Sequence, residues 1–262
     1  MLFTRLIALG LLAVILVACS QGGGDTSDIK PIREAYAKGF YLEARSGYER
    51  YLQLYPKGEF RLEAWERLLE IAMNVSGNMD QAISLLEAMI LEFGHENEAA
   101  WDLMNRLADM YEQNNQRTQA LAALEKSLDF SADDPGKTID TRMHMARLYR
   151  TEREYDLAVD LLKRCVEEAT DPKLRAECLY EEAQTYSYMQ SWGQAKEVLE
   201  VIVKEKQADE AIYPQAVFLL ADVYEQELNY PKARALFESI KETYPNPKVI
   251  EIRLQNLGKD KL

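Results

Sequence analysis

Small and apolar residues recur along most of this 262-residue chain at a nearly constant spacing. Six alanines, at intervals of 37 or 38 residues, mark the period: Ala44, Ala82, Ala120, Ala158, Ala195 and Ala233. A large apolar residue follows each alanine by four positions: Tyr48, Leu86, Leu124, Leu162, Leu199 and Phe237. In the last four copies a tyrosine precedes the alanine by nine positions: Tyr111, Tyr149, Tyr186 and Tyr224. A fixed period of this length indicates one structural unit copied six times.

The fourth copy illustrates the elements that the pattern predicts. Residues 141–150 carry apolar side chains at helical spacing, and a second helical pattern follows Tyr155. A short polar turn separates the two patterns, and Asp171-Pro172 ends the copy. Each unit is therefore expected to be a pair of helices. One pair cannot bury its apolar face alone, but six in a row share a continuous core.

The register of these residues resembles the tetratricopeptide repeat. In that family a tyrosine ends the first helix, Ala-x3-Phe lies in the second, and a proline follows. The matches in the sixth and first copies are Tyr224, Ala233, Phe237 and Pro245, and Ala44, Tyr48 and Pro56. The resemblance implies an all-α, tetratricopeptide-like α-solenoid, a right-handed superhelix, with six helix-turn-helix repeats over residues 28–245. The period near 38 exceeds the usual value of about 34, which predicts longer helices or connections.

The C-terminal segment predicts one further helix. Pro247 fits its first turn, Ile250, Leu254 and Leu257 form one apolar stripe, and Gly258 fits its C-cap. Solenoids need such a terminal element with one polar face. Residues 246–262 are therefore expected to form a capping helix and tail.

The N-terminal segment has the pattern of a leader. A basic start with Arg5 precedes the apolar run 6–17, which is too short to span a membrane comfortably, and Leu16-Val17-Ala18-Cys19 ends it. This arrangement resembles a bacterial lipoprotein signal over residues 1–18. The resemblance implies that Cys19 is acylated, for example with palmitate, and that residues 19–27 form a flexible tether. The alternative is an ordinary secretory signal that happens to end near Cys19.

The residue after the cysteine bears on the location. Ser20 resembles the sorting signal for the outer membrane, which implies an anchor in that membrane facing the periplasm. A host with a single membrane would instead carry the protein on its plasma membrane. The formal net charge is −13, and removal of Arg5 with the leader makes it one unit more negative. Contact with the membrane is therefore expected through the lipid anchor only, and nucleic acid is not expected as a partner.

Motifs for catalysis or cofactor binding are not found in the sequence. Neither His95 nor His144 has a Cys or His neighbour at metal-ligand spacing, and no metal site is predicted. The glycines 22–24 follow no predicted strand, so they do not form a phosphate-binding loop, and no Gly-x-Ser-x-Gly elbow occurs. We therefore expect a protein that is not an enzyme and that needs no cofactor.

Two cysteines remain after the lipid site at Cys19. Cys165 and Cys178 lie at similar distances on either side of the Asp171-Pro172 turn, so an antiparallel helix pair would bring them to the same height. In an oxidising envelope they could form a disulfide. The alternative is a pair of buried thiols that pack as small apolar residues.

A binding surface is predicted from the resemblance, because the first helix of each tetratricopeptide repeat lines the concave side. The residues at those positions are Arg67, Asn105, Arg106, Asp109, His144, Arg147, Tyr180, Gln184, Tyr188 and Phe218. Aromatic, Arg and amide side chains suit an extended peptide. Alternatively, Tyr180 and Phe218 pack between repeats and the other side chains are simply solvated. Ile71 and Asp140 break the pattern of the family's peptide-carboxylate clamp.

These observations together predict a lipid-anchored protein–protein interaction scaffold of the bacterial cell envelope. The segment 51–58 resembles the first repeat boundary of the tetratricopeptide lipoproteins of the outer-membrane β-barrel assembly machinery, which would imply a role in outer-membrane protein assembly. Two alternatives stay open. One is a pilotin-type lipoprotein of a pilus or secretion system, and the other is an envelope lipoprotein that binds a small ligand.

Overall fold

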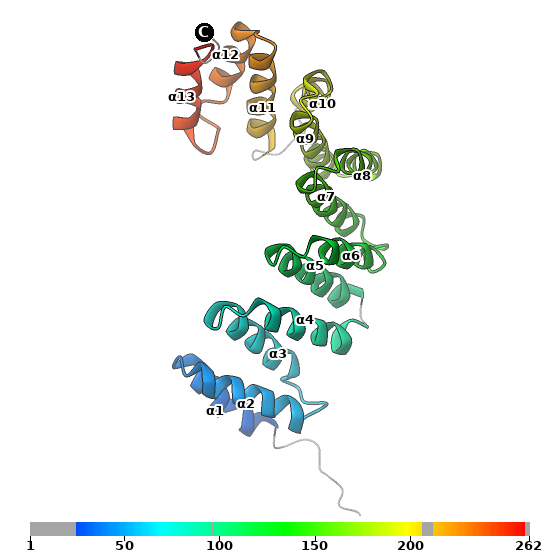
Figure 1. Cartoon of the computed structure of the whole chain (residues 1–262), viewed down its shortest axis with the longest axis vertical. Coiled ribbons are helices and arrows are strands. Elements are labelled where there is room, and N and C mark those ends of the chain that lie inside the picture. Colours follow the sequence, from blue (N-terminus) through cyan, green and yellow to red (C-terminus); the bar gives the residue numbers. More distant parts are fainter. Residues whose placement is uncertain (1–24, 96, 206–211, 260–262) are drawn as a thin grey trace, which may run out of the picture. The chain divides into compact units, whose positions relative to one another are not determined.

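The computed structural model describes residues 25–95, 97–205 and 212–259, and every regular element in these ranges is helical (Figure 1). Within these ranges the chain forms thirteen α-helices and one short π-helix, which follow one another as helix–turn–helix repeats and a final single helix. The prediction of an all-α, tetratricopeptide-like fold is confirmed. The predicted signal peptide, Cys19 and most of the predicted tether lie outside the described residues. None of the described helices is both long enough and apolar enough to cross a membrane.

The chain divides into two compact units, residues 1–78 and 79–262. In the first, α1 (Asp25–Ala37) and α2 (Tyr41–Leu54) form a pair, and α2 also packs against α3 (Arg61–Glu70). The π-helix η1 (Ile71–Val75) continues α3 directly. Because α1 begins at Asp25, residues 25–27 are helical, although the sequence assigned them to the tether. Asp28 adds negative charge to the first turns, which stabilises the N-terminal end of a helix.

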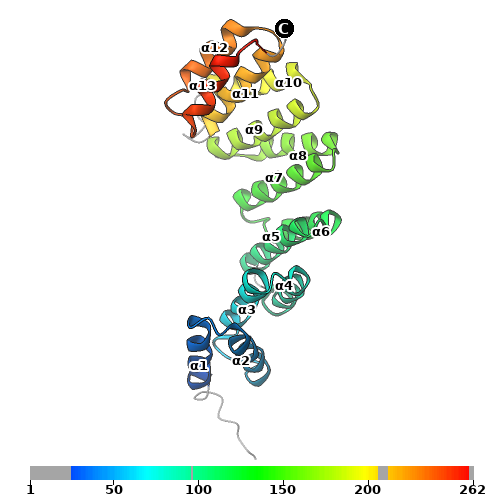
Figure 2. The same ribbon diagram turned by 60° about the vertical axis from the view of Figure 1, so that its left-hand side comes forward.

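The second unit contains the other ten helices. Their bounds are α4 (Met79–Phe93), α5 (Asn97–Gln113), α6 (Arg117–Leu128), α7 (Pro135–Thr151), α8 (Tyr155–Glu168), α9 (Pro172–Tyr188), α10 (Trp192–Glu205), α11 (Ile212–Gln226), α12 (Tyr230–Ser239) and α13 (Pro247–Asn256). Each helix packs against the next, and α9 also packs against both α7 and α11 (Figure 2). The first helices of these three successive repeats, α7, α9 and α11, therefore lie beside one another.

The residues that define the period form the core of both units. All six repeat alanines have no exposed surface, and neither do the six large apolar residues four positions later. An alanine lets two helices approach closely, and the larger side chain fills the space beside that contact. The alanine and the large apolar residue four positions later are buried in every copy. The repeated sequence pattern therefore corresponds to the same packing arrangement in each copy.

The turn inside each helix pair contains a feature that the sequence analysis missed. One residue with positive φ stands five positions before each repeat alanine: Gly39, Gly77, Asn115, Arg153, Gln190 and Leu228, with φ between 57° and 79°. The N–H of the next residue donates to a carbonyl at the end of the first helix, as from Gln116 to Tyr111 and from Glu154 to Tyr149. This geometry ends a helix through the left-handed conformation. Two of the six residues are glycines, so the pattern is not visible in residue types.

The second copy departs from the others at this turn. Asn78 donates to the carbonyl of Ala72, one residue further back than in the other copies, and Ser76 donates to Ile71 across the π-helix. A π-turn accommodates one extra residue in a helix. The extra residue lies in the copy where Met73 replaces the tyrosine.

A disulfide joins α8 to α9. Cys165 and Cys178 are both fully buried, and their Cα atoms are 5.9 Å apart. The two helices run in opposite directions from the Asp171-Pro172 turn, which places the cysteines at one level. Asp171 caps α9 by accepting a hydrogen bond from the N–H of Lys173, and Pro172 occupies the first turn.

Candidate protein-binding face

Four of the residues predicted on the binding surface line one pocket between α5, α7 and α9. They are Asn105 and Asp109 on α5, and His144 and Arg147 on α7. The pocket has a volume of about 500 Å³, and five residues that the sequence analysis did not single out for binding complete it: Trp101, Glu112, Asp140, Met143 and Glu177. The structure therefore brings together part of the predicted surface.

The pocket is predominantly acidic. Asp109, Glu112, Asp140 and Glu177 supply four carboxylates, whereas Arg147 is the permanent cation of the lining. Partial burial raises the pKa of Asp109, the His144 side chain opposes that effect, and the charge of Glu112 adds to it. Burial also raises the pKa of Asp140, although Arg147 lowers it. These carboxylates would gain from a cation that enters the pocket.

One hydrogen bond joins α5 to α7 at the pocket, and another lies within α5. The indole Nε1 of Trp101 donates to Oγ1 of Thr141 at 3.0 Å, and Thr141 is fully buried. The amide of Asn105 donates to the Trp101 carbonyl at 2.8 Å, which leaves its side chain tied to its own helix. The Trp101–Thr141 bond helps to fix the spacing of the two helices that carry most of the lining.

Other predicted residues lie elsewhere. Arg67 belongs to the first unit, where it donates to Glu70 at 2.6 Å and lies over the Tyr36 ring. Arg106 lies on α5 and makes an ion pair with Asp102 at 3.7 Å. Neither residue lines the pocket.

Tyr180 and Phe218 pack in the core of the C-terminal repeats. Both are partly buried against its apolar cluster, and Phe218 stacks on Tyr244 with ring centroids 5.0 Å apart. Burial raises the pKa of Tyr180, and a hydrogen bond with Gln184 opposes that shift. For these two aromatic residues, packing between helices describes the structure better than a solvent-facing binding role.

Tyr188 lies at the end of α9 and is 64% exposed. The Arg150 guanidinium lies over its ring, 5.5 Å from the centroid. An exposed aromatic ring beside an arginine is a suitable contact for a peptide. Gln184 lies one turn earlier on α9 and is partly buried.

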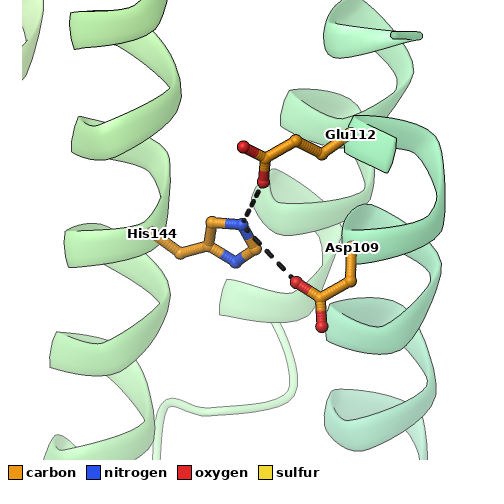
Figure 3. Close-up of side chains that lie close together, drawn as sticks. All are labelled: Asp109, Glu112 and His144. Carbon is orange, nitrogen blue, oxygen red and sulfur yellow. Dashed lines mark hydrogen bonds and ion pairs between the residues drawn. The ribbon is translucent and has the colours of Figure 1, made fainter. Parts of the chain in front are cut away.

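Three clusters of charged side chains among the described residues join α5 to α7, α7 to α9 and α11 to α13. We call them the inter-repeat charge clusters. In each, two residues one turn apart hold one residue of the facing helix. On α5 and α7, His144 Nε2 lies 3.1 Å from Glu112 Oε2 and 3.7 Å from Asp109 Oδ1 (Figure 3). The spacing of three residues between Asp109 and Glu112 puts both carboxylates on one face of α5.

The second cluster has the opposite sign. Arg147 and Arg150 of α7 hold the buried Glu181 of α9, with N–O distances of 2.7 and 2.9 Å. In the third, Asp222 and Glu225 of α11 hold Arg253 of α13, and the Arg253–Glu225 distance is 2.6 Å. The paired positions on α5, α7 and α11 occupy equivalent places before the repeat alanine. The sequence shows these pairs, but it does not show which residue of the next repeat faces them.

Tyrosines at the repeat position also connect successive repeats. Tyr111 donates to Glu87 of α4 at 2.7 Å, and Tyr224 donates to Glu200 of α10 at 2.8 Å. Both glutamates stand five positions after a repeat alanine. Burial and the neighbouring carboxylate raise the pKa of each tyrosine to about 12. The repeat spacing therefore positions hydrogen-bonding side chains as well as apolar ones.

Comparison with known proteins agrees with this architecture. Residues 102–134 match the tetratricopeptide repeat model, and residues 135–251 match the model of the Iml2/Tetratricopeptide repeat protein 39 family. Residues 102–251 therefore match models of tetratricopeptide-repeat families. No curated protein sequence matches the chain significantly.

Solved structures share the tetratricopeptide fold at low sequence identity. The apo form of the quorum sensor NprR from B. thuringiensis has a TM-score of 0.59 at 17% identity, over 89% of this chain and 68% of that one. BtubC (BKLC) from P. vanneervenii has a TM-score of 0.57 at 15% identity, over 88% and 90%. The tetratricopeptide-like repeats of a putative kinesin light chain from Podospora anserina have a TM-score of 0.54 at 21% identity, over 74% and 97%.

The tetratricopeptide repeat is a scaffold that commonly binds protein partners, and it is not typically catalytic. The matches to the repeat models therefore support the coarse assignment of a protein–protein interaction scaffold. The location in the envelope, the lipid anchor and the absence of catalysis stay predictions.

Proposed function

We propose that this chain is a lipid-anchored scaffold of the bacterial cell envelope that holds a basic, extended segment of a partner protein against α5, α7 and α9. The observation that carries this proposal is the acidic pocket lined by Asp109, Glu112, Asp140 and Glu177. A lysine or arginine of the partner would enter the pocket, since complementary charge selects partners and speeds association. The exposed Tyr188 would provide a neighbouring aromatic contact.

Two features support the envelope part of the proposal. The Leu-Val-Ala-Cys sequence ending at Cys19 resembles a lipoprotein signal. The disulfide between Cys165 and Cys178 suits an oxidising compartment, because structural disulfides are rare where thiols are kept reduced. Ser20 favours sorting to the outer membrane, with the repeats on the periplasmic side.

Within the envelope, we favour a role in outer-membrane protein assembly because segment 51–58 resembles the corresponding lipoprotein group. A pilotin would use the same lipid anchor and repeats to accompany a secretin. A small-ligand receptor would use the pocket instead, but the lining is mostly charged rather than apolar, which is unlike most small-molecule sites.

The partner is identified by photo-crosslinking in living cells, with the crosslinking residue at Asn105 or Glu177 in the pocket. Matched control positions are Arg164 and Glu167, which are exposed on α8. The expected result is a partner captured from the pocket positions and not from the controls, through a segment rich in Lys or Arg. Barrel-assembly components would support outer-membrane assembly, and a secretin would support the pilotin.

A charge-reversal variant tests the chemistry of the contact. Asp140→Lys together with Glu177→Lys is expected to weaken binding of the captured segment at least tenfold, because two attractive charges become repulsive. Glu167→Lys serves as the control for added positive charge. If the double variant binds the segment as tightly as the wild type, or if only α8 positions crosslink, the acidic pocket is not the binding site.

A further inference from the structure

The cluster of Asp109, Glu112 and His144 differs chemically from the other two inter-repeat charge clusters. In the cluster between α11 and α13 the two carboxylates hold an arginine, which is always charged and does not ligate metals. Between α5 and α7 the equivalent carboxylates hold an imidazole nitrogen. Imidazole is the commonest metal ligand among side chains, and it combines readily with carboxylates around a divalent ion.

The donor atoms already stand at the separation that such an ion requires. One oxygen each of Asp109 and Glu112 and one ring nitrogen of His144 all lie within 4.8 Å of one another. Ligands at about 2.0–2.1 Å around a tetrahedral Zn²⁺ are separated by about 3.3 Å. The two distances from Nε2, 3.1 and 3.7 Å, lie on either side of this value. Small side-chain rotations would be enough to complete the geometry.

We propose that Asp109, Glu112 and His144 form a binding site for a transition-metal dication, with Zn²⁺ as the ion that best suits one imidazole and two carboxylates. The backbone support is suitable because two ligands share one face of α5 and the third stands on α7, and the Trp101–Thr141 hydrogen bond fixes the helix spacing. Three protein ligands leave a fourth position open. It faces the pocket that these residues line.

Access and charge agree with this assignment. The side chain of His144 is 18% exposed, whereas those of Asp109 and Glu112 are 58% and 42% exposed, so an ion can enter from the solvent side. The two carboxylates would neutralise a dication, and Asp140 adds further negative charge to the same pocket. The site requires no partner, and its existence does not depend on the proposed function.

The competing explanation is an ion pair alone, in which a protonated His144 does what Arg253 does between α11 and α13. The variant His144→Arg separates the two explanations. An arginine keeps the cation between the two carboxylates, as in the α11–α13 cluster, but it removes the metal ligand. His95→Ala is the matched control, because His95 is the chain's other histidine and is exposed.

The experiment is calorimetric titration of the purified full chain with ZnCl2, accompanied by thermal unfolding with and without the ion. The wild type and His95→Ala are expected to bind one Zn²⁺ and to unfold at a higher temperature when it is present. His144→Arg and the pair Asp109→Asn with Glu112→Gln are expected to bind at least about tenfold more weakly. Circular dichroism checks that each variant stays helical.

Three results would overturn the proposal. One is a wild type that binds no Zn²⁺ even at millimolar concentration of the ion. Another is equal affinity for the wild type and His144→Arg, which would leave the ion pair as the sole role of the cluster. The last is loss of binding in His95→Ala while His144→Arg binds normally. A failed crosslinking experiment would affect none of these results, so the two proposals are tested separately.

Discussion

The first and second units fill equivalent repeat positions with different side chains. In the first unit the residue four positions after the repeat alanine is Tyr48, and its ring contacts Tyr36 edge to face, with centroids 6.4 Å apart. In the second unit Leu86, Leu124, Leu162 and Leu199 fill this position with an aliphatic side chain, and only the last repeat uses a ring, that of Phe237. The same backbone arrangement therefore accepts either a ring or a branched aliphatic group beside a fixed alanine.

The hydroxyl of Tyr48 also contrasts with those of the repeat tyrosines in the second unit. The hydroxyl of Tyr48 is buried and has no hydrogen-bond partner among the described residues, and burial raises its pKa to about 12. The tyrosines of the second unit stand at another repeat position and are used differently, since Tyr111 and Tyr224 donate across repeats to glutamates. The repeat period therefore determines which positions carry large side chains. Whether a tyrosine hydroxyl finds a hydrogen-bond acceptor depends on the side chains of the neighbouring repeat.

The disulfide between Cys165 and Cys178 lies in the second unit, and its removal is expected to have the largest effect on stability. We expect Cys165→Ala with Cys178→Ala to lower the free energy of unfolding of the second unit by about 3 kcal/mol, because the disulfide closes a short loop in the unfolded chain. Hydrogen exchange should show faster exchange in α8 and α9 and no change in α1 and α2. Equal acceleration in α1 and α2 would mean that the two units unfold as one.

The C-terminal charge cluster should make the second unit sensitive to pH. Burial raises the pKa of Asp222 to about 6 from the ordinary value of 3.8, although Arg253 opposes the shift. Between these values the folded protein binds more protons than the unfolded chain, so the free energy of unfolding falls as the pH rises. We expect this contribution to be about 2 kcal/mol, since Asp222 keeps some contact with solvent.

The variant Asp222→Asn isolates this contribution, because asparagine does not titrate. The stability of the wild type relative to Asp222→Asn should decrease between pH 4 and pH 6, measured by urea unfolding at each pH. A constant difference across this range would show that Asp222 has the same pKa in the folded and unfolded states.

The two kinds of tyrosine provide a matched pair of substitutions. Tyr111→Phe removes a hydrogen bond between repeats and is expected to destabilise the second unit by about 1 kcal/mol. Tyr48→Phe removes a hydroxyl without a partner and is expected to be neutral or to stabilise the first unit by about 0.5 kcal/mol. Urea unfolding of both variants measures the contrast. Destabilisation by both to the same extent would contradict the different roles that we assign.

Substitutions at the turn residues with positive φ are expected to change stability least. Gly39 of the first unit and Leu228 of the second stand at equivalent positions, with φ of 79° and 60°. Leu228 is 57% exposed, so Leu228→Gly loses little packing and relieves the left-handed strain. We expect a gain of about 0.5 kcal/mol, whereas Gly39→Ala should cost about 1 kcal/mol. Thermal unfolding compares the two, and a loss of stability in Leu228→Gly would mean that its side-chain contacts outweigh the strain.

Much of the fold could be predicted because each repeat is a local element. The helix pair, the buried Ala158 and the buried Leu162 follow from spacing alone, since apolar residues at helical intervals must share a face. The left-handed turns could not be predicted, because Arg153 and Leu228 are poor candidates for positive φ and only the requirement to end one helix and begin the next imposes it. The π-helix at the end of α3 was not predicted either, because no residue type in Ile71–Val75 indicates it.

The candidate site was predictable in part. Asn105, Asp109, His144 and Arg147 were identified because the first helix of each repeat faces the binding side. Glu112 stands one turn from Asp109, and this spacing was a signal that could have been used. Phe218 was assigned to the binding surface, but its ring packs against Phe237 of α12 and Tyr244 of the connection that follows α12.

The sequence by itself determined the number of helix pairs, the positions of the core and the acidic charge of the chain, because these depend on spacing and composition. Only the tertiary structure decided which charged residues face one another across repeats. His144 lies between two carboxylates, while Glu181 lies between two arginines, and both follow from the stagger of neighbouring helices. That stagger is set by packing between side chains far apart in the sequence, and no local pattern contains it.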